Sequence, residues 1–123
     1  MSKEIKQVIV MRNDLNMRKG KMVAQGAHAS IAFLIDCVLG DSGPRSIETK
    51  WMIQGQTKIC VRVDSEAQLL EIEAKARAAN LTAYVITDAG HTEFGGVPTK
   101  TCLAIGPDYA DEVDKITGTL KLL

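Results

Sequence analysis

Three polar side chains, Lys21, Gln25 and His28, follow one another along residues 17–30 at spacings of four and three. At ~100° per residue these positions lie within about 60° of one another on a helix, so they share one face. An ammonium, an amide and an imidazole on one face could bind an anion or stabilise a developing negative charge. Exposed helices also carry such polar faces, so the spacing alone leaves a solvated surface open as an alternative.

The start of the same predicted helix carries three cations, Arg18, Lys19 and Lys21, with Gly20 between them. Positive charges oppose the helix dipole at this end, at a cost of about 0.3–1 kcal/mol each. Free backbone N–H groups and lysines together form a phosphate site, and Gly20 allows a ligand to approach the backbone closely. The crowding of cations therefore indicates that an anion binds here.

A second group of reactive side chains surrounds the glycine-rich segment 88–98, DAGHTEFGGVP. Asp88 directly follows a predicted strand, and Thr99 and Thr101 begin the next one. A carboxylate close to Lys21 would hold its ammonium or accept a proton from water, while threonine hydroxyls bind a carbonyl oxygen or position that water. Asp88 as a plain turn residue and Thr101 as an ordinary strand residue remain open alternatives.

Other chemistries are not supported by the spacing of the residues. His28 and His91 are the only histidines, and the three cysteines form no CxxC pair, so no metal and no other cofactor is expected. The GxSxG, P-loop and GxGxxG motifs of serine hydrolases, nucleotide triphosphatases and dinucleotide-binding proteins do not occur.

The composition indicates one globular domain over residues 1–123, with 46% apolar residues and a formal net charge of zero. Residues 1–21 nevertheless hold six cations against two acidic residues. Such a basic face could attract a phosphate backbone, although solvated surface charge gives the same pattern. Because no apolar run of ~20 residues and no secretory leader is evident, we expect a cytoplasmic protein without a membrane span.

Apolar periodicity and turn residues predict a three-layer α/β fold, a four-stranded mixed sheet with helices on both faces, in the order β-α-α-β-α-β-β-α. Strands are expected over 5–12, 58–63, 82–87 and 99–106. Helices are expected over 19–39, 44–54, 65–79 and from Gly106-Pro107-Asp108 to about 117.

The orientation of helix 19–39 decides which way the polar trio points. Asn16 or a neighbour is expected to cap this helix. One face carries apolar residues at helical spacing and is expected to contact the core; its members are Val23, Ala27, Ile31, Leu34 and Val38. The trio of Lys21, Gln25 and His28 would then face solvent or a cleft.

The sequence resembles the type 2 peptidyl-tRNA hydrolase family, the archaeal and eukaryotic kind, in three ordered segments. These are VIVMRNDLNMRKGKMVAQGAHAS (8–30), VITDAGHTEFGGVPTKTCLAIGP (85–107) and VDKITGTLKLL (113–123). The resemblance implies metal-free hydrolysis, usually by a homodimer, of the ester that links a peptidyl group to the terminal ribose of tRNA. It places catalytic roles on Lys21, Asp88, Thr92 and Thr101. Substrate-binding positions would be Asn13, Asp14, Arg18, Lys19, Gly20, Gln25, His28 and His91.

The chain departs from the family pattern at Arg18, where glycine is usual, and at His91, where Arg or Lys is common. The segment EFGGVPTK is one residue longer than usual, and Thr101 matches only after that insertion. A non-catalytic module that binds RNA or a nucleotide on the same scaffold is therefore the alternative, and a protein-interaction domain is a third.

Overall fold

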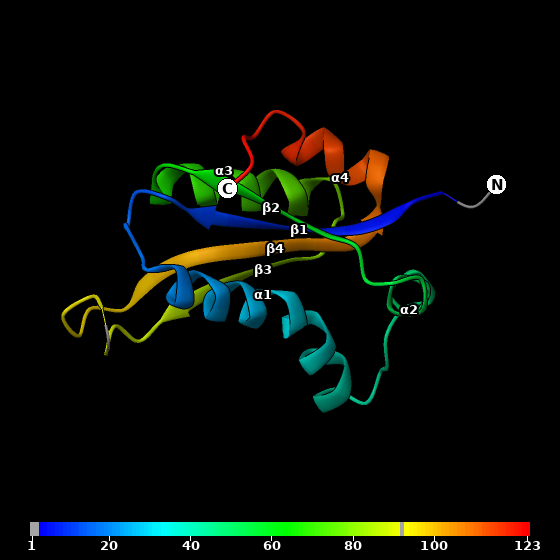
Figure 1. The fold of residues 1–123 in the computed structure, drawn as a ribbon. Coiled ribbons are helices and arrows are strands. Elements are labelled where there is room, and N and C mark those ends of the chain that lie inside the picture. The colour runs from blue at the N-terminus through cyan, green and yellow to red at the C-terminus, as the bar shows by residue number, and fades with distance from the viewer. Residues whose placement is uncertain (1–2, 92) are drawn as a thin grey trace.

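The computed structural model describes residues 3–91 and 93–123, and its elements follow the predicted order (Figure 1). The strands are β1 (Ile5–Arg12), β2 (Lys58–Val63), β3 (Ala83–Asp88) and β4 (Thr99–Tyr109). The helices are α1 (Lys19–Leu39), α2 (Ser46–Ile53), α3 (Glu66–Ala78) and α4 (Ala110–Thr117). The mixed sheet has the strand order β2-β1-β4-β3, with β1 parallel to β2 and antiparallel to β4.

Helices cover both faces of the sheet, with α1 and α2 on one side and α3 and α4 on the other (Figure 1). The apolar sequence of β1 follows from this arrangement, because a central strand must be buried on both faces. Val8 and Val10 belong to the core cluster that includes residues of α3 and α4, whereas Ile9 and Met11 belong to a second cluster, beneath α1. The predicted three-layer architecture is confirmed.

The last long strand extends further than expected. Gly106, Pro107 and Asp108 were predicted to open the final helix, but they lie inside β4, which runs to Tyr109. After a bulge in the β1 pairing, Lys6 and Ile5 pair with Asp108 and Tyr109, so the backbone stays in the sheet. Gly106 has a φ of +87° and lies against the Lys6 carbonyl, where a Cβ would approach to 2.9 Å.

The orientation predicted for α1 is wrong. Its buried residues are Gln25, Gly26, Ala29, Ser30 and Phe33, so the helix packs on the sheet mainly through small side chains. At Gly26 an added Cβ would lie 3.7 Å from Met11, which shows how closely the helix approaches β1. The apolar face predicted to contact the core points away from the sheet, and Val23 and Val38 are 73% and 68% exposed. The N-cap is Arg18, without a side-chain cap, and not Asn16, which has a φ of +54°.

Among the described residues, α1 is the one helix long and apolar enough to cross a membrane, with a mean hydropathy of 1.6 over its best 18 residues. About a quarter of that window, 28%, is buried within the protein. Helices of soluble proteins can reach the same length and hydropathy, and α1 here covers one face of the sheet (Figure 1). The hydropathy of α1 is therefore weak support for a membrane span.

Candidate functional site

Lys21 and Asp88 meet where the first turn of α1 approaches the end of β3. The Lys21 ammonium donates a hydrogen bond to Asp88 Oδ1 at 2.8 Å, and both side chains are only 14% exposed. The bond from Lys21, together with one from the Gly90 backbone, holds the pKa of the Asp88 carboxyl below its usual range. The carboxylate is therefore ionised at neutral pH, and the site contains a shielded ion pair.

The glycine-rich loop after β3 fixes the second oxygen of this carboxylate. The Gly90 N–H donates to Asp88 Oδ2 at 2.8 Å. Gly90 has a φ of +84°, and an added Cβ would approach the Val97 carbonyl oxygen to 2.3 Å. The Gly96 N–H donates to the Gly90 carbonyl at 2.8 Å, which closes the loop on itself. Only glycine fits at position 90, and its place in the loop sets the orientation of Asp88.

Gln25 connects this pair to the interior of the protein. Its amide donates to Asp88 Oδ1 at 3.3 Å, and its side-chain oxygen accepts a hydrogen bond from the Thr101 hydroxyl at 2.5 Å. Gln25 is buried and Thr101 has no exposed surface. The chain of contacts Thr101–Gln25–Asp88–Lys21 thus runs from β4 through α1 to the site. Thr101 lies beneath Gln25 and orients its amide.

The segment of α1 that carries this network is fixed to the sheet at Gln25 itself. The Cys102 thiol donates to the Gln25 backbone carbonyl at 3.4 Å, one residue along β4 from Thr101. One turn further on, the Ser30 hydroxyl donates a hydrogen bond to the side-chain oxygen of Gln7 at 2.6 Å inside the protein. These contacts fix the distance of α1 from the sheet and its rotation about its own axis, and therefore the position of Lys21.

Two residues at the site were not predicted from the sequence. The Phe94 ring lies under the Lys21 ammonium, 5.8 Å from nitrogen to ring centre, within the range of a cation–π contact. Arg12 pairs with Asp14 at 2.6 Å and donates to the Lys100 carbonyl at 3.0 Å. This pairing lowers the pKa of Asp14 and connects the loop after β1 to the start of β4. No motif in the sequence indicates either contact.

The remaining predicted residues that the structure describes lie at the surface. Arg18, Lys19 and Gly20 are exposed at the start of α1, and Arg18 makes an exposed ion pair of 3.8 Å with Glu93. The other exposed members of the predicted set are Asn13, Asp14, His28 and His91. Thr92 lies outside the described residues. Within the described part of the chain, no three His, Cys, Asp or Glu residues gather as a metal site would require.

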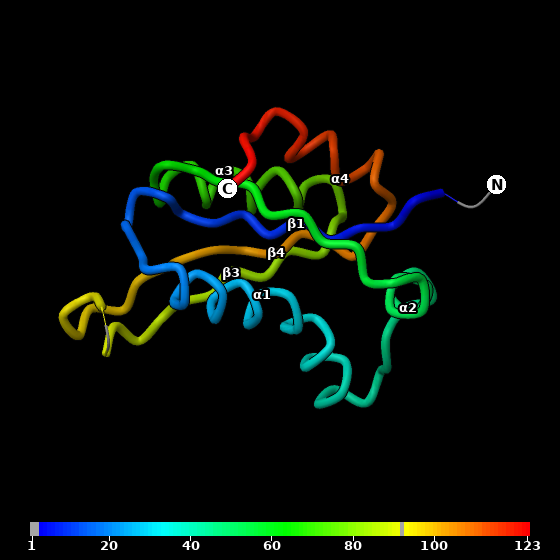
Figure 2. Tube along the Cα trace, viewed as in Figure 1, coloured from blue at the N-terminus to red at the C-terminus, as the bar shows by residue number. Residues whose placement is uncertain are grey.

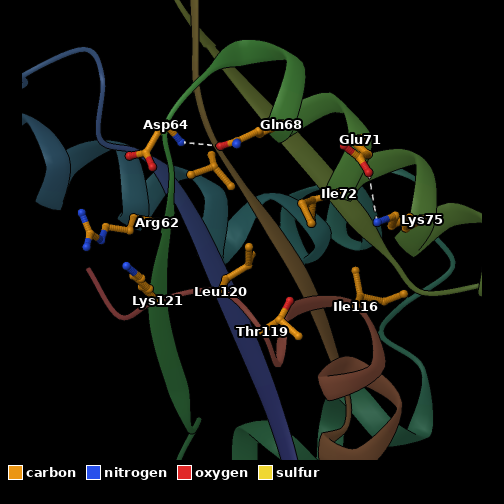
Figure 3. Close-up of a pocket in the computed structure, with 11 residues that line it drawn as sticks. Arg62, Asp64, Gln68, Glu71, Ile72, Lys75, Ile116, Thr119, Leu120 and Lys121 are labelled. Atoms are coloured by element: carbon orange, nitrogen blue, oxygen red, sulfur yellow. Dashed lines mark hydrogen bonds and ion pairs between the residues drawn. The ribbon is translucent and has the colours of Figure 1, made fainter.

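Two cavities of similar size lie on opposite faces of the sheet. The first, about 480 Å³, runs between α1 and β3 and ends at Gln25 and Asp88. The second, about 450 Å³, lies between α3 and the C-terminal segment, with Arg62 and Lys121 at one end and Ile72, Ile116 and Leu120 among its lining (Figure 3). Its Lys75 is paired with Glu71 on the same helix at 3.0 Å. Of these two cavities, the first is the one that Asp88 lines, and Asp88 is the partner of Lys21.

The path of the chain also shows which segments form the site. Figure 2 shows the loop between β3 and β4 turning back beside the start of α1. The Lys21–Asp88 bond connects α1 to the end of β3, and the contact between Lys21 and Phe94 connects α1 to this loop. The site is therefore built from the first turn of α1, the end of β3 and the loop that follows it.

Comparison with known proteins shows which family the chain is similar to. A family model described as "Peptidyl-tRNA hydrolase PTH2" matches residues 5–123. The chain is 48% identical to the peptidyl-tRNA hydrolase of Methanocaldococcus jannaschii over 119 residues, and 45% identical to that of Methanothermobacter thermautotrophicus over 122. Each match covers 97% of this chain and 100% of the relative. A solved structure of a protein of unknown function from Agrobacterium tumefaciens strain C58 superposes with a TM-score of 0.56 at 14% identity, over 100% of this chain and 99% of that one, which shows the shared fold alone.

Proposed function

The chain belongs to the peptidyl-tRNA hydrolase family PTH2, and we propose that it hydrolyses peptidyl-tRNA at the Lys21–Asp88 site. The reaction cleaves the ester between the peptidyl group and the terminal ribose of tRNA, and so releases the tRNA for reuse. The single observation that carries the assignment to this site is the shielded ion pair of 2.8 Å at the end of the cavity. We also propose that residues 1–123 act as one domain.

In the reaction we propose, water attacks the carbonyl carbon and Lys21 stabilises the negative charge that develops on the carbonyl oxygen. As the bond between this carbon and the ribose oxygen breaks, the proton lost by the water passes to the ribose oxygen, so the products are the free peptide acid and the tRNA hydroxyl. A positioned cation is effective here because its stabilising interaction strengthens as charge develops in the transition state. Asp88 holds the ammonium in place and accepts a hydrogen bond from the attacking water. Its lowered pKa makes the carboxylate a weak base, which favours this orienting role over removal of a proton.

Gln25 and Thr101 are proposed to act by positioning. The Thr101 hydroxyl donates to the Gln25 side-chain oxygen, and the Gln25 amide in turn donates to Asp88. Both hydrogen bonds form within the protein, so they are in place before the substrate binds. Fixing the carboxylate in advance removes reorganisation from the reaction step. A direct contact between Thr92 and the carbonyl or the water stays a prediction.

The proposed contact with tRNA involves the cationic start of α1. Arg18 and Lys19 are exposed, the first turn of the helix has no acidic residue, and the N-cap side chain makes no capping hydrogen bond. Backbone N–H groups and cations are therefore available to a phosphate next to the Lys21–Asp88 pair. Affinity for tRNA should fall as salt concentration rises, because phosphate contacts release counterions. Because translation takes place in the cytoplasm, we propose that the protein acts there.

The experiment that tests the activity follows release of tRNA from N-acetyl-aminoacyl-tRNA by the purified protein, with and without EDTA. We expect multiple turnover in both conditions, because Lys21 and Asp88 supply the charge that the reaction needs. Loss of turnover in EDTA that returns on adding a divalent cation would contradict a metal-independent reaction. Salt-sensitive binding of the tRNA without any hydrolysis would favour the non-catalytic RNA-binding module.

We further propose that the chain forms a homodimer through the outer face of α1. Large apolar side chains are exposed along this helix; they are Val23, Ile31, Ile35, Val38 and Leu39. These five positions carry no charge, so the same face on a second copy could pack against them about a two-fold axis without placing like charges together.

Replacing Val38 with glutamate should convert this dimer to a monomer, because the interface would then bury two carboxylates close together. Sedimentation velocity over a range of protein concentrations measures the change. Val97→Glu is the matched control, since Val97 is 61% exposed and belongs to the loop before β4 and not to α1. A wild-type protein that sediments as a monomer, or a dimer that persists in Val38→Glu, would refute this interface.

A further inference from the structure

The cavity beside the catalytic pair is a groove with two different walls. One wall is the outer edge of β3, from Tyr84 to Asp88, continued by Ala89. The other wall is α1, through side chains that include His28 and Ala32. The groove ends at Asp88, so a group attached to a carbonyl bound at Lys21 and Asp88 has this groove beside it.

The β3 wall offers unpaired backbone groups, because β3 is the last strand of the sheet. The Gly106 N–H donates to the Thr82 carbonyl at 2.9 Å, which sets the phase of the pairing. By the alternation of antiparallel pairs, Tyr84 and Ile86 bond to β4, whereas the N–H and C=O of Val85 point outward. Within the described chain, no hydrogen bond outside the sheet involves the backbone of Val85. Such an edge is a template for another extended chain.

The carbonyl of Ala83, two residues before Val85, also points away from β4, as this alternation requires. Its contacts show where the free edge of β3 begins. The Arg77 guanidinium donates to the Ala83 carbonyl at 2.9 Å, so this group is already bonded. Beyond it, the wall from Tyr84 to Ala89 spans about 16 Å at about 3.3 Å per residue. An extended peptide of about four or five residues fits that length.

The α1 wall combines the small Ala32 with the larger His28 and Ile35. Ala32 is half-buried and small, and the Tyr84 hydroxyl is hydrogen-bonded to Asp36 at the far end of the groove. That bond to a carboxylate, with burial, raises the pKa of Tyr84 to about 12, so the phenol stays neutral and the two walls stay joined there. The free N–H and C=O of Val85 would recognise the peptide backbone, which is common to all nascent chains.

We propose that this groove binds the peptide part of the substrate as an extended strand parallel to β3, hydrogen-bonded through its backbone to Val85. The inference rests on the proposed function, since the ester at Lys21 and Asp88 fixes where the peptide ends. The peptide then runs N-terminally from Asp88 towards Tyr84, so both chains point the same way. Binding remote from the ester contributes to kcat/KM when that contact is kept in the transition state.

The test is a series of substrates with one to six alanines between an N-acetyl group and tRNA, each assayed for kcat/KM. We expect kcat/KM to rise about tenfold up to four alanines and then to stay level, since one or two added backbone hydrogen bonds are of that size. Equal values at all lengths would overturn the groove as a peptide site while leaving the hydrolase assignment intact. Absence of hydrolysis at every length would overturn the hydrolase assignment, and this inference with it.

A matched pair of variants locates the effect. Ala32→Tyr narrows the groove from the helix side and should abolish the rise in kcat/KM with peptide length. Ala74→Tyr makes the same change at an exposed alanine of α3, on the other face of the sheet, and should retain the wild-type rise. A rise that survives in folded Ala32→Tyr would place the peptide elsewhere. The wild-type series decides the matter without either variant, should Ala32→Tyr not fold.

Discussion

Replacing Lys21 with methionine should lower kcat for N-acetyl-aminoacyl-tRNA by roughly 10²–10³-fold, the usual effect of removing one group that stabilises an oxyanion. Methionine keeps an unbranched stem of similar length against the Phe94 ring but carries no charge. The fold should be retained, because Lys21 lies in the first turn of α1 and outside the apolar clusters. Steady-state kinetics, with circular dichroism to check the helix content, measures this change.

Lys19→Met is the matched control for this result, since Lys19 is an exposed lysine in the same helical turn. We expect Lys19→Met to raise KM in a salt-dependent way with little effect on kcat, as the loss of a phosphate contact would. Full activity of Lys21→Met would end the assignment of Lys21 as the group that stabilises the transition state. A fall in kcat of the same size in both variants would indicate a general loss of positive charge instead.

Asp88→Asn should reduce kcat by about 10²-fold or more at neutral pH, although asparagine has nearly the same shape as aspartate. The neutral amide can no longer hold the Lys21 ammonium as an ion pair, and it gives the attacking water a weaker acceptor. The carboxylate bonds to Lys21, Gln25 and the Gly90 N–H would all be weakened together. Single-turnover hydrolysis isolates this effect from product release.

The pH dependence of the wild type provides a second test of Asp88. The active form is the carboxylate, and its pKa is lowered from the ordinary value of 3.8, chiefly by the Lys21 hydrogen bond. Activity that depends on this group is therefore lost only as the pH falls through the lowered pKa, and Asp88 should cause no decline between about pH 8 and about pH 5.

Asp111→Asn, at an exposed carboxylate of α4, is the control and should keep the wild-type rate. An Asp88→Asn enzyme with wild-type kcat would refute the role of the ion pair. A decline in wild-type activity centred well above pH 5, and absent from Asp88→Asn, would show that the carboxyl titrates far above the range that its contacts imply.

The sheet and the central pair were predictable because they depend on local patterns. The apolar run of β1 predicts a strand buried on both faces, and the glycine-rich segment after β3 predicts a functional loop. Lys21 and Asp88 then meet because a helix start and a strand end lie at the same edge of the sheet, 2.8 Å apart in the structure. The cations that oppose the helix dipole at the start of α1 predict an anion site there.

The face of α1 that contacts the sheet was not predictable from hydrophobicity. The sequence places its large apolar residues, such as Val23 and Val38, on the face opposite the one that contacts the sheet. Close approach to β1 instead requires small residues, and Gly26 and Ala29 provide them. Periodicity detects an apolar face but does not distinguish a surface buried within one chain from one that is available to a partner.

The contacts around the Lys21–Asp88 pair join segments that are far apart in the sequence. Thr101 on β4 contacts Gln25 on α1 although the two residues are 76 positions apart in the sequence. Phe94 contacts Lys21 only because Gly90 allows the loop to close at a positive φ. Neither relation leaves a spacing pattern in the sequence, since each joins segments separated by dozens of residues.

The central claim is that Lys21 and Asp88 act as one unit, and a double-mutant cycle tests it most directly. Single-turnover rates on N-acetyl-aminoacyl-tRNA are compared for the wild type, Lys21→Met, Asp88→Asn and the double variant. If the pair acts as a unit, the double variant should be no slower than the slower single variant, because either substitution alone already removes the joint effect. A double variant whose loss equals the product of the two single losses would show that the residues act independently and would contradict this account.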